Sequence, residues 1–538
     1  MRGTHFCNIH SWLAIYFIKS KKEIEEDFNL DIKKEIFKTK ETVSSGTSAI
    51  MTDGDFIVPD NKADIGQIIR VSAVPAIHSY EIQGEKAVVS GEVTFTVLYL
   101  PENMAEDFIC SLNYSRNFTD VCDTKGATGN VFVHFDCDIA SLDFAVINSR
   151  KINLKATVDA AYSAYRINEN ALPTEISCDF PLEIQKSGAR ALTVVTDEKI
   201  ILKLPERFAL PDEMSAAGEI LSVDAEVIGH DVKIITGKAI IKGSIKLSIL
   251  YKSFETSAAE FFEHEYSFTE ILDLPEITDD MDVEIQYKIQ SVSCDMDTDS
   301  SGFEVETEVA VHVMVTAEKT PIVITDCYSP DFKLNVTTRS CPLEYLAGKS
   351  SDTVSVRSFV SLPDNCPPVM KIYRTVAKPF IDSITGDSAT TVINGTLDTY
   401  ILYMSSEPDM PLYSYRSPIS FTVSADTGVI SDTAKIECDV MCDECTFLPA
   451  GINQVEIRAN VTVKTKVTDT ESIDVIENIS VGDAINPSPG TITICFIEQG
   501  ETMWDIAKRY CVPAEKIYFA NKLPVDVLPK AGTPLLIP

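Results

Sequence analysis

Alternating apolar and polar positions dominate most of this 538-residue chain. In the segment Gly91–Leu100, Val93, Phe95 and Val97 fall on one face, with two threonines and Leu98 on the other. The segment 242–252 repeats the alternation. A period of two is typical of a half-buried β-strand, and few segments show the helical period of 3.6. The pattern therefore predicts antiparallel β-domains of the sandwich or barrel-like kind.

Hairpins are predicted at three further places. Turn-like residues precede each of three alternating segments, which are Ile152–Val158, Phe303–Val309 and Val455–Val461. A turn cluster followed by a period-two run is the usual sequence signal of a hairpin.

The same unit occurs three times along the chain. Pro-Asp pairs begin at Pro59, Pro211 and Pro363, so the step is 152 residues each time (211 − 59 and 363 − 211). Glycines and Leu-Tyr pairs recur at the same interval, and the glycines are Gly91, Gly243 and Gly395. A period this long indicates tandem domains, because solenoid repeats are far shorter. We expect each glycine to relieve crowding or to carry a bulge at the start of a strand.

These repeats predict the domain organisation. The expected parts are an N-terminal tail (1–30), three β-repeats (31–182, 183–334 and 335–481), a linker (482–491) and a terminal module (492–538). Two prolines, two glycines and a serine between residues 482 and 490 predict an extended tether.

The terminal module reads as strand, helix, helix, strand. A strand over 494–497 leads to Gly500-Glu501-Thr502, and Thr502 is a good N-cap for a helix carrying Trp504. Pro513 begins a second helix that ends at Asn521, and Gly532 turns the chain into the last strand. In order and residues this segment resembles the LysM module.

The LysM resemblance implies a binding groove between two loops. LysM modules commonly bind N-acetylglucosamine polymers there. Carried onto this chain, the groove and its neighbouring aromatic comprise Gly500, Glu501, Thr502, Met503, Trp504, Val527, Leu528, Pro529 and Lys530. Cys495, Glu501 and Cys511 depart from the usual pattern, so the groove could instead hold a protein. For Trp504 two interpretations stay open, a partner anchor and a core residue of the module.

Composition narrows the partners. The formal net charge is −35, which argues against binding nucleic acid, anionic membranes or wall polymers. A simpler interpretation is that the charge keeps a large protein in solution. The 45% hydrophobic content is ample for packed cores.

Cysteine use and the first residues indicate a reducing compartment. The fourteen cysteines lack the regular spacing of a disulfide scaffold. The apolar run Phe6–Ile18 has Arg2 before it and lysines after it, shows no cleavage site, and is too short to span a bilayer. We expect no export signal and no transmembrane segment, and interpret residues 1–25 as a tail or an upstream extension. A membrane-surface anchor is the alternative.

No pattern in the chain predicts catalysis or a cofactor. The seven histidines form no metal-ligand motif, and Gly348-Lys349-Ser350 lacks the glycine that a phosphate-binding loop needs at position 343. Cys438, Cys442 and Cys445 have zinc-like spacing, but a second CxxC is missing, so we expect ordinary thiols and no metal. The chain is therefore expected to be a binding protein without enzymatic activity.

Tandem β-repeats with these Pro-Asp, Gly and Leu-Tyr anchors, followed by one LysM, resemble the SPOCS-domain spore coat morphogenesis proteins of endospore-forming Firmicutes, the SipL-like group. The resemblance implies a scaffold in the mother-cell cytoplasm at the forespore surface. There its LysM would dock on the coat-basement ATPase SpoIVA and promote encasement, with other coat proteins as possible further partners. The alternatives are a peptidoglycan or N-acetylglucosamine-polymer binder, which would require export, and an enzyme hidden in one β-repeat.

Overall fold

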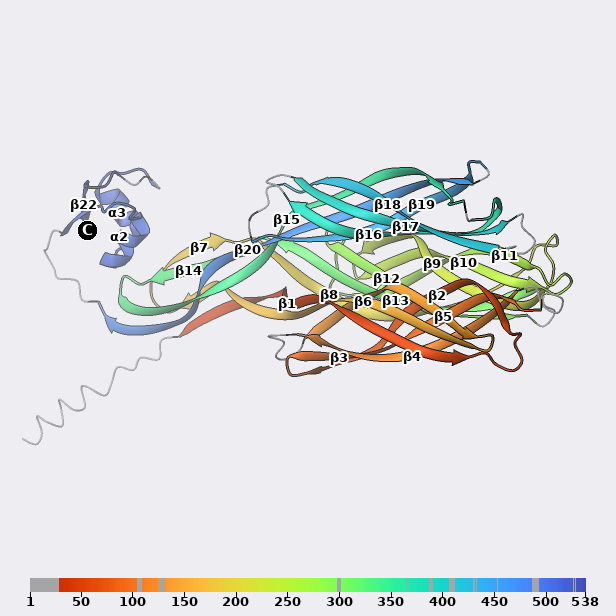
Figure 1. The fold of residues 1–538 in the computed structure, drawn as a ribbon. Helices are drawn as coiled ribbons and strands as arrows, with labels where there is room; N and C mark the ends of the chain where they lie inside the picture. The colour runs from red at the N-terminus through yellow and green to blue at the C-terminus, as the bar shows by residue number, and fades with distance from the viewer. Residues whose placement is uncertain are drawn as a thin grey trace, which may run out of the picture.

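The computed structural model describes residues 29–538 apart from 104–108, 125–130, 298–300, 365, 387–389, 406–411, 429–430, 432, 452, 486–492, 526 and 528. Long antiparallel strands make up most of the described chain, and its two helices lie in the terminal module (Figure 1). The mainly β fold class with a small α+β module is therefore confirmed. Among the described residues, no helix is both long enough and apolar enough to cross a membrane.

Six strands build each repeat, in two three-stranded antiparallel sheets. The first repeat pairs them as β1-β6-β5 and β2-β3-β4; its strands are β1 (Leu30–Ile57), β2 (Ile65–Gln83), β3 (Lys86–Pro101), β4 (Cys110–Asp123), β5 (Phe132–Asn148) and β6 (Lys151–Cys178). The second pairs them as β8-β13-β12 and β9-β10-β11; its strands are β8 (Ala191–Ala209), β9 (Ala217–Ile235), β10 (Lys238–Ser253), β11 (Ala259–Asp273), β12 (Asp282–Met296) and β13 (Gly302–Lys319). The third pairs them as β15-β20-β19 and β16-β17-β18; its strands are β15 (Phe332–Ser361), β16 (Val369–Gly386), β17 (Thr390–Ser405), β18 (Leu412–Asp426), β19 (Lys435–Pro449) and β20 (Gln454–Ala484).

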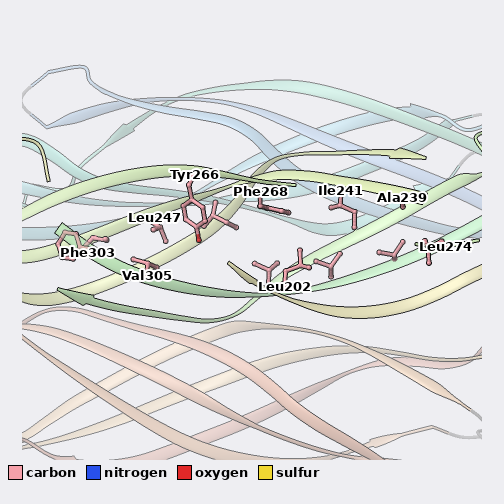
Figure 2. Packing of buried hydrophobic residues seen from close by; sticks show 14 of the residues in the cluster. Leu202, Ala239, Ile241, Leu247, Tyr266, Phe268, Leu274, Phe303 and Val305 are labelled. Carbon is pink, nitrogen blue, oxygen red and sulfur yellow. The ribbon is translucent and has the colours of Figure 1, made fainter. Parts of the chain in front are cut away.

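The two sheets of a repeat pack face to face around an apolar core. In the second repeat, Leu247 of β10 lies beside Val305 of β13, and Ile241 lies farther along the same core (Figure 2). Each large side chain buried in this way contributes about 1.5–3 kcal/mol relative to an exposed one. The predicted hairpins β5–β6, β12–β13 and β19–β20 are confirmed by their antiparallel registers.

The repeated glycines lie where the prediction placed a bulge. Gly243 of β10 pairs directly with Phe268 of β11, and the β9–β10 register shifts beside it, between Lys242 and Ser244. A Cβ at Gly243 would lie 2.7 Å from Cζ of Phe268, so the bare glycine makes room for the ring. Gly91 has the same arrangement under Phe118. The expected relief of crowding is confirmed, and a bulge does lie here, but its extra residue belongs to the facing strand β9 and not to the glycine.

The tyrosine of each Leu-Tyr pair holds the loop that carries the Pro-Asp turn. The hydroxyl of buried Tyr99 donates to the carbonyl of Ala63 at 2.7 Å, and Tyr251 and Tyr403 make the matching bonds to Ser215 and Pro367. The repeated motif therefore fixes one loop to one strand in every copy.

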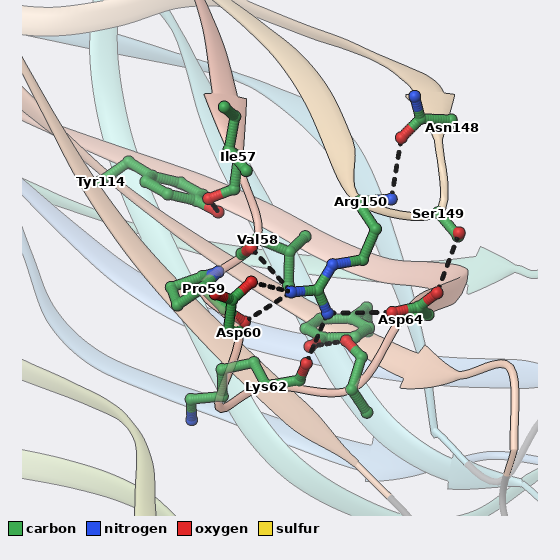
Figure 3. A network of polar contacts seen from close by, with 12 residues as sticks. Ile57, Val58, Pro59, Asp60, Lys62, Asp64, Tyr114, Asn148, Ser149 and Arg150 are labelled. Carbon is green, nitrogen blue, oxygen red and sulfur yellow. Dashed lines mark hydrogen bonds and ion pairs between the residues drawn. The ribbon is translucent and has the colours of Figure 1, made fainter.

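The first repeat reinforces this loop with an arginine. Arg150, in the β5–β6 turn, donates to the carbonyls of Val58, Pro59 and Lys62 at 2.8–3.1 Å and pairs with Asp64 at 2.9 Å (Figure 3). Its guanidinium thus donates to three backbone oxygens of the loop, one of which, that of Pro59, also accepts from the backbone N–H of Lys62.

The three repeats meet through the outer faces of their β2-, β9- and β16-type sheets. Leu98, Leu250 and Leu402 occupy equivalent positions 152 residues apart (250 − 98 and 402 − 250) and bury in one shared cluster. The alternation had placed Leu98 on the polar face of a half-buried strand. That face is covered because the two other repeats pack on it, which the pattern of one strand does not reveal.

Strand extensions continue beyond the repeats as a narrower stalk, to the left in Figure 1. Three two-stranded ribbons form it. They are the first residues of β1 with the end of β6, β7 (Glu183–Gly188) with β14 (Ile322–Tyr328), and the start of β15 with the end of β20. Their apolar side chains share two clusters, which include Phe37, Val323 and Val475. We call this the three-ribbon stalk.

The terminal module follows the predicted order. Its elements are β21 (Thr493–Phe496), α2 (Met503–Tyr510), α3 (Ala514–Ala520) and β22 (Pro534–Ile537), with β21 and β22 paired. The predicted linker starts inside β20, because Ala484 still pairs with Phe332. The remainder of that linker from residue 486 and the predicted tail up to residue 28 lie outside the described residues.

Candidate functional site

The first loop of the predicted groove is held by Glu501. Gly500 has a positive φ of 85°, which lets the chain turn sharply after β21. The Glu501 carboxylate accepts from the backbone N–H of Glu498 at 3.0 Å and pairs with Arg509 of α2. Only 6% of the Glu501 side chain is exposed, so it positions the loop and does not line the surface.

Helix α2 begins with the predicted cap. The hydroxyl of Thr502 accepts from the backbone N–H of Asp505 at 3.2 Å, and the Asp505 carboxylate accepts from the N–H of Thr502 at 2.8 Å. This reciprocal capping box satisfies two helix-end donors, and the Thr502 hydrogen bonds hold the pKa of Asp505 below its ordinary value. Met503 turns inward and is buried in the core of the module, away from the groove surface.

The second loop presents exposed residues. Val527 and Lys530 are exposed and Pro529 is half-buried. The Lys530 carbonyl accepts from both the backbone N–H and the hydroxyl of Thr533, which closes a turn before β22. Leu528, the other predicted residue here, lies outside the described residues.

Trp504 faces the three-ribbon stalk. Its indole Nε1 donates to Oδ2 of Asp326 in β14 at 2.9 Å. Lys508, one helical turn later, approaches both oxygens of the same carboxylate at 2.6 and 2.7 Å. Asp326 is therefore paired with a charge and an indole donor from one face of α2, which orients the module on the β7–β14 ribbon.

Tyr328 completes this contact from the stalk side. Its ring packs edge-on against Trp504 with centroids 5.0 Å apart, and its hydroxyl donates to the carbonyl of Val512 at 3.0 Å. Tyr328 is only 4% exposed and belongs to the apolar core of the module, although it lies in β14. Burial raises the pKa of its hydroxyl above the ordinary value.

Sequence reasoning missed Asp326 and Tyr328. They stand 178 and 184 residues from their partners Trp504 and Val512, in an ordinary strand with no motif. Only the three-dimensional placement of the ribbon end beside α2 brings them together. For Trp504 the geometry shows a third role beside the two predicted ones, as a contact between the module and the stalk.

Among the described residues, no element covers one apolar face of the module. Ile494 and Phe496 of β21 and Leu536 of β22 share the outer face of the two-stranded sheet, opposite the buried Cys495 and Leu535. Phe496 is 63% exposed. We call these three residues the outer sheet face.

The described residues contain no group of three or more His, Cys, Asp or Glu side chains arranged to hold a metal ion. Cys438, Cys442 and Cys445 are free thiols on β19.

Comparison with protein families matches three segments of the chain to two family models. Residues 64–147 and 216–297 match the model "SipL, SPOCS domain", and residues 497–538 match the LysM domain. The chain carries SipL-type SPOCS domains and a LysM domain. Both are binding domains, and their combination is that of a sporulation coat protein with a LysM module. The resemblance drawn from the sequence is thus confirmed.

The matched SPOCS segments correspond closely to strands β2–β5 and β9–β12, the same part of each repeat. The third repeat shows the same strand order outside the matched segments. No curated protein and no solved structure matched the chain.

Proposed function

We propose that the SPOCS–LysM chain is a non-enzymatic scaffold of the spore coat. Its LysM domain docks on the coat-basement ATPase SpoIVA at the forespore surface, from the mother-cell cytoplasm, and the docked chain promotes encasement. The observation that carries the proposal is an uncovered apolar surface on a LysM domain joined to SPOCS repeats.

The chemistry of the module favours a protein partner. The outer sheet face offers three neighbouring apolar side chains without a covering element among the described residues. Apolar and aromatic side chains at the centre of an interface supply most of its binding energy. The carboxylate of Glu501 pairs with Arg509 and is enclosed, so it does not face a ligand such as a sugar hydroxyl.

In this proposal some residues of the predicted groove are free to contact a partner, and others hold the module's structure. Thr502, Val527 and Lys530 are exposed and can touch a partner. Glu501, Met503 and Trp504 hold the first loop and helix α2 in place, through Arg509, the core and Asp326. The β-repeats, fixed to the module through β14, would carry contacts to other coat proteins.

A binding titration of the full chain tests the proposal against both candidate ligands. Purified SpoIVA and N-acetylglucosamine oligomers are titrated in parallel. We expect binding to SpoIVA, weakened about tenfold or more by Phe496→Ser, since loss of an aromatic anchor costs roughly 1.4 kcal/mol or more. Phe254→Ser is the matched control, because Phe254 is similarly exposed (76%) but lies in the second repeat.

Two results would overturn the proposal. Equal SpoIVA binding by wild type and Phe496→Ser would remove the outer sheet face from the interface. Binding to the oligomers without binding to SpoIVA would make the module a glycan-recognition domain.

A further inference from the structure

One of the β-bulges in each repeat lies at the same place in all three copies. The extra residue follows Ile139 in β5, Ile289 in β12 and Cys442 in β19. The residue before the bulge pairs with Val158, Val309 and Val461, which are equivalent positions of β6, β13 and β20. The bulge is therefore a property of the repeat, independent of the side chains it carries.

The bulge changes which residues share a face. In a regular strand, residues three apart point to opposite faces. One inserted residue turns a separation of three into an effective separation of two, so Cys442 and Cys445 both face the core. Both pack against the same apolar cluster of the third repeat.

In the other repeats this pair of positions is apolar. Ile139 and Leu142 hold it in the first repeat, and Ile289 and Val292 in the second, each packed on its own core. Two thiols replace two aliphatic side chains only in the third repeat. Packing alone is served by either choice, so the cysteines add a chemistry that the other copies lack.

The two thiols interact in the reduced chain. The Cys442 thiol donates to the carbonyl of Glu444 at 3.6 Å, and a hydrogen bond from Cys445 lowers the pKa of Cys442. The same bond, together with burial, raises the pKa of Cys445. Both side chains are half-buried, so small reagents can reach them. Cys442 is thus the thiol with more of the nucleophilic thiolate form.

Backbone spacing allows a bond between them. Two residues of extended chain span roughly 6.6–6.8 Å, and the bulge brings this three-residue separation close to that value. Disulfides join Cα atoms about 4.4–6.8 Å apart, so a small adjustment of the bulge suffices.

We propose that Cys442 and Cys445 form a redox-modifiable dithiol, which closes to an intramolecular disulfide by exchange with a low-molecular-weight disulfide. The Cys442 thiolate attacks one sulfur of that reagent, forms a mixed disulfide and releases one thiolate, which takes up a proton. The Cys445 thiol then loses its proton and attacks Sγ of Cys442, releasing the second thiol. Overall the protein dithiol is oxidised by two electrons, and the reagent is reduced to two thiols.

Closure would act on an edge strand. β19 lies at the edge of its sheet and pairs with β20 alone. A covalent link across the bulge fixes the one irregular point of that edge. The proposal stands apart from SpoIVA docking, which involves a different part of the chain, so either can fail without the other.

Mass spectrometry of the full chain tests it. The protein is incubated with oxidised glutathione and alkylated, and trypsin releases residues 436–458, which hold all three cysteines of β19. We expect a Cys442–Cys445 disulfide with Cys438 alkylated. Cys438, whose thiol donates to the Thr465 hydroxyl at 3.7 Å, is the in-chain control.

Variants separate the two steps. Cys445→Ser should stop at the mixed disulfide on Cys442. In Cys442→Ser, the remaining Cys445 should form a mixed disulfide at least about tenfold more slowly. Cys438→Ser should close like wild type. The double variant Cys442→Ile with Cys445→Leu, which copies the first repeat, should fold normally and take up no glutathione in β19.

The proposal is overturned by any of three results. These are a bridge that includes Cys438, equal mixed-disulfide rates at Cys442 and Cys445 in the single variants, or no reaction of either thiol in the folded chain.

Discussion

Trp504 of the LysM domain and Asp326 of the stalk, 178 residues apart in sequence, share a 2.9 Å hydrogen bond that is reinforced by Lys508. The contact joins the module to one ribbon. It also means that Trp504, for which a partner anchor and a core role were both open, contacts another part of the same chain.

Replacing Asp326 should loosen the module. Asp326→Ala leaves the Trp504 indole and Lys508 without their acceptor, and charge-assisted bonds of this kind contribute about 1.5–3 kcal/mol. Hydrogen exchange should quicken in α2 and β14, while the β-repeats stay protected. Asp31→Ala, at an exposed position of the same stalk, is the control. Unchanged exchange in α2 would show that Tyr328 alone fixes the module.

Filling the space at Gly243 should destabilise the second repeat. A Cβ there would lie 2.7 Å from the ring of Phe268, which cannot move without disturbing the core. Overpacking of this kind costs about 1–3 kcal/mol, so Gly243→Ala should lower the urea midpoint. The control is Gly188→Ala, where a Cβ meets nothing within 4 Å. Equal midpoints for the two variants would refute the packing argument.

Removing the helix cap should weaken α2 locally. Thr502→Ala deletes one half of the capping box, which is typically worth about 1 kcal/mol. We expect faster hydrogen exchange at the first turn of α2, and Thr502→Ser should restore protection. If serine fails to rescue, the methyl group and not the hydroxyl is responsible.

Acid should destabilise the contact between the first two repeats. Burial, with Lys199 nearby, lowers the pKa of His134 to about 4, and its ring stacks on His312 at 5.6 Å. The folded chain therefore resists protonation that the unfolded chain accepts. Above about pH 6.5 His134 is neutral in both states and does not affect the free energy of unfolding. Between about pH 6.5 and pH 4 it lowers the free energy of unfolding by about 1.4 kcal/mol for each pH unit of acidification. Urea unfolding of His134→Gln should lose less stability than wild type between pH 7 and pH 5. Parallel losses would show that other groups control the acid response.

The sequence predicted what is repeated or local. Gly243 under Phe268, the Thr502 cap and the hairpins are all encoded within a few residues or one repeat period. How the repeats, the stalk and the terminal module pack on one another could not be predicted from the sequence. Leu98 looked like a residue of an open face until two other repeats covered it, and Asp326 carries no mark of its role. Contacts across 178 residues depend on how whole sheets pack, which no short pattern records.

The asymmetry of the stalk has a consequence for assembly. Three similar lobes surround a common centre, and three ribbons extend from them, and among the described residues Asp326 and Tyr328 of one ribbon bond to the module. The attached module therefore makes one of three similar sides of the molecule different from the other two. If the module docks on a layer, every molecule would bind in the same orientation about its long axis. Each attachment point would then bring three repeats to the layer.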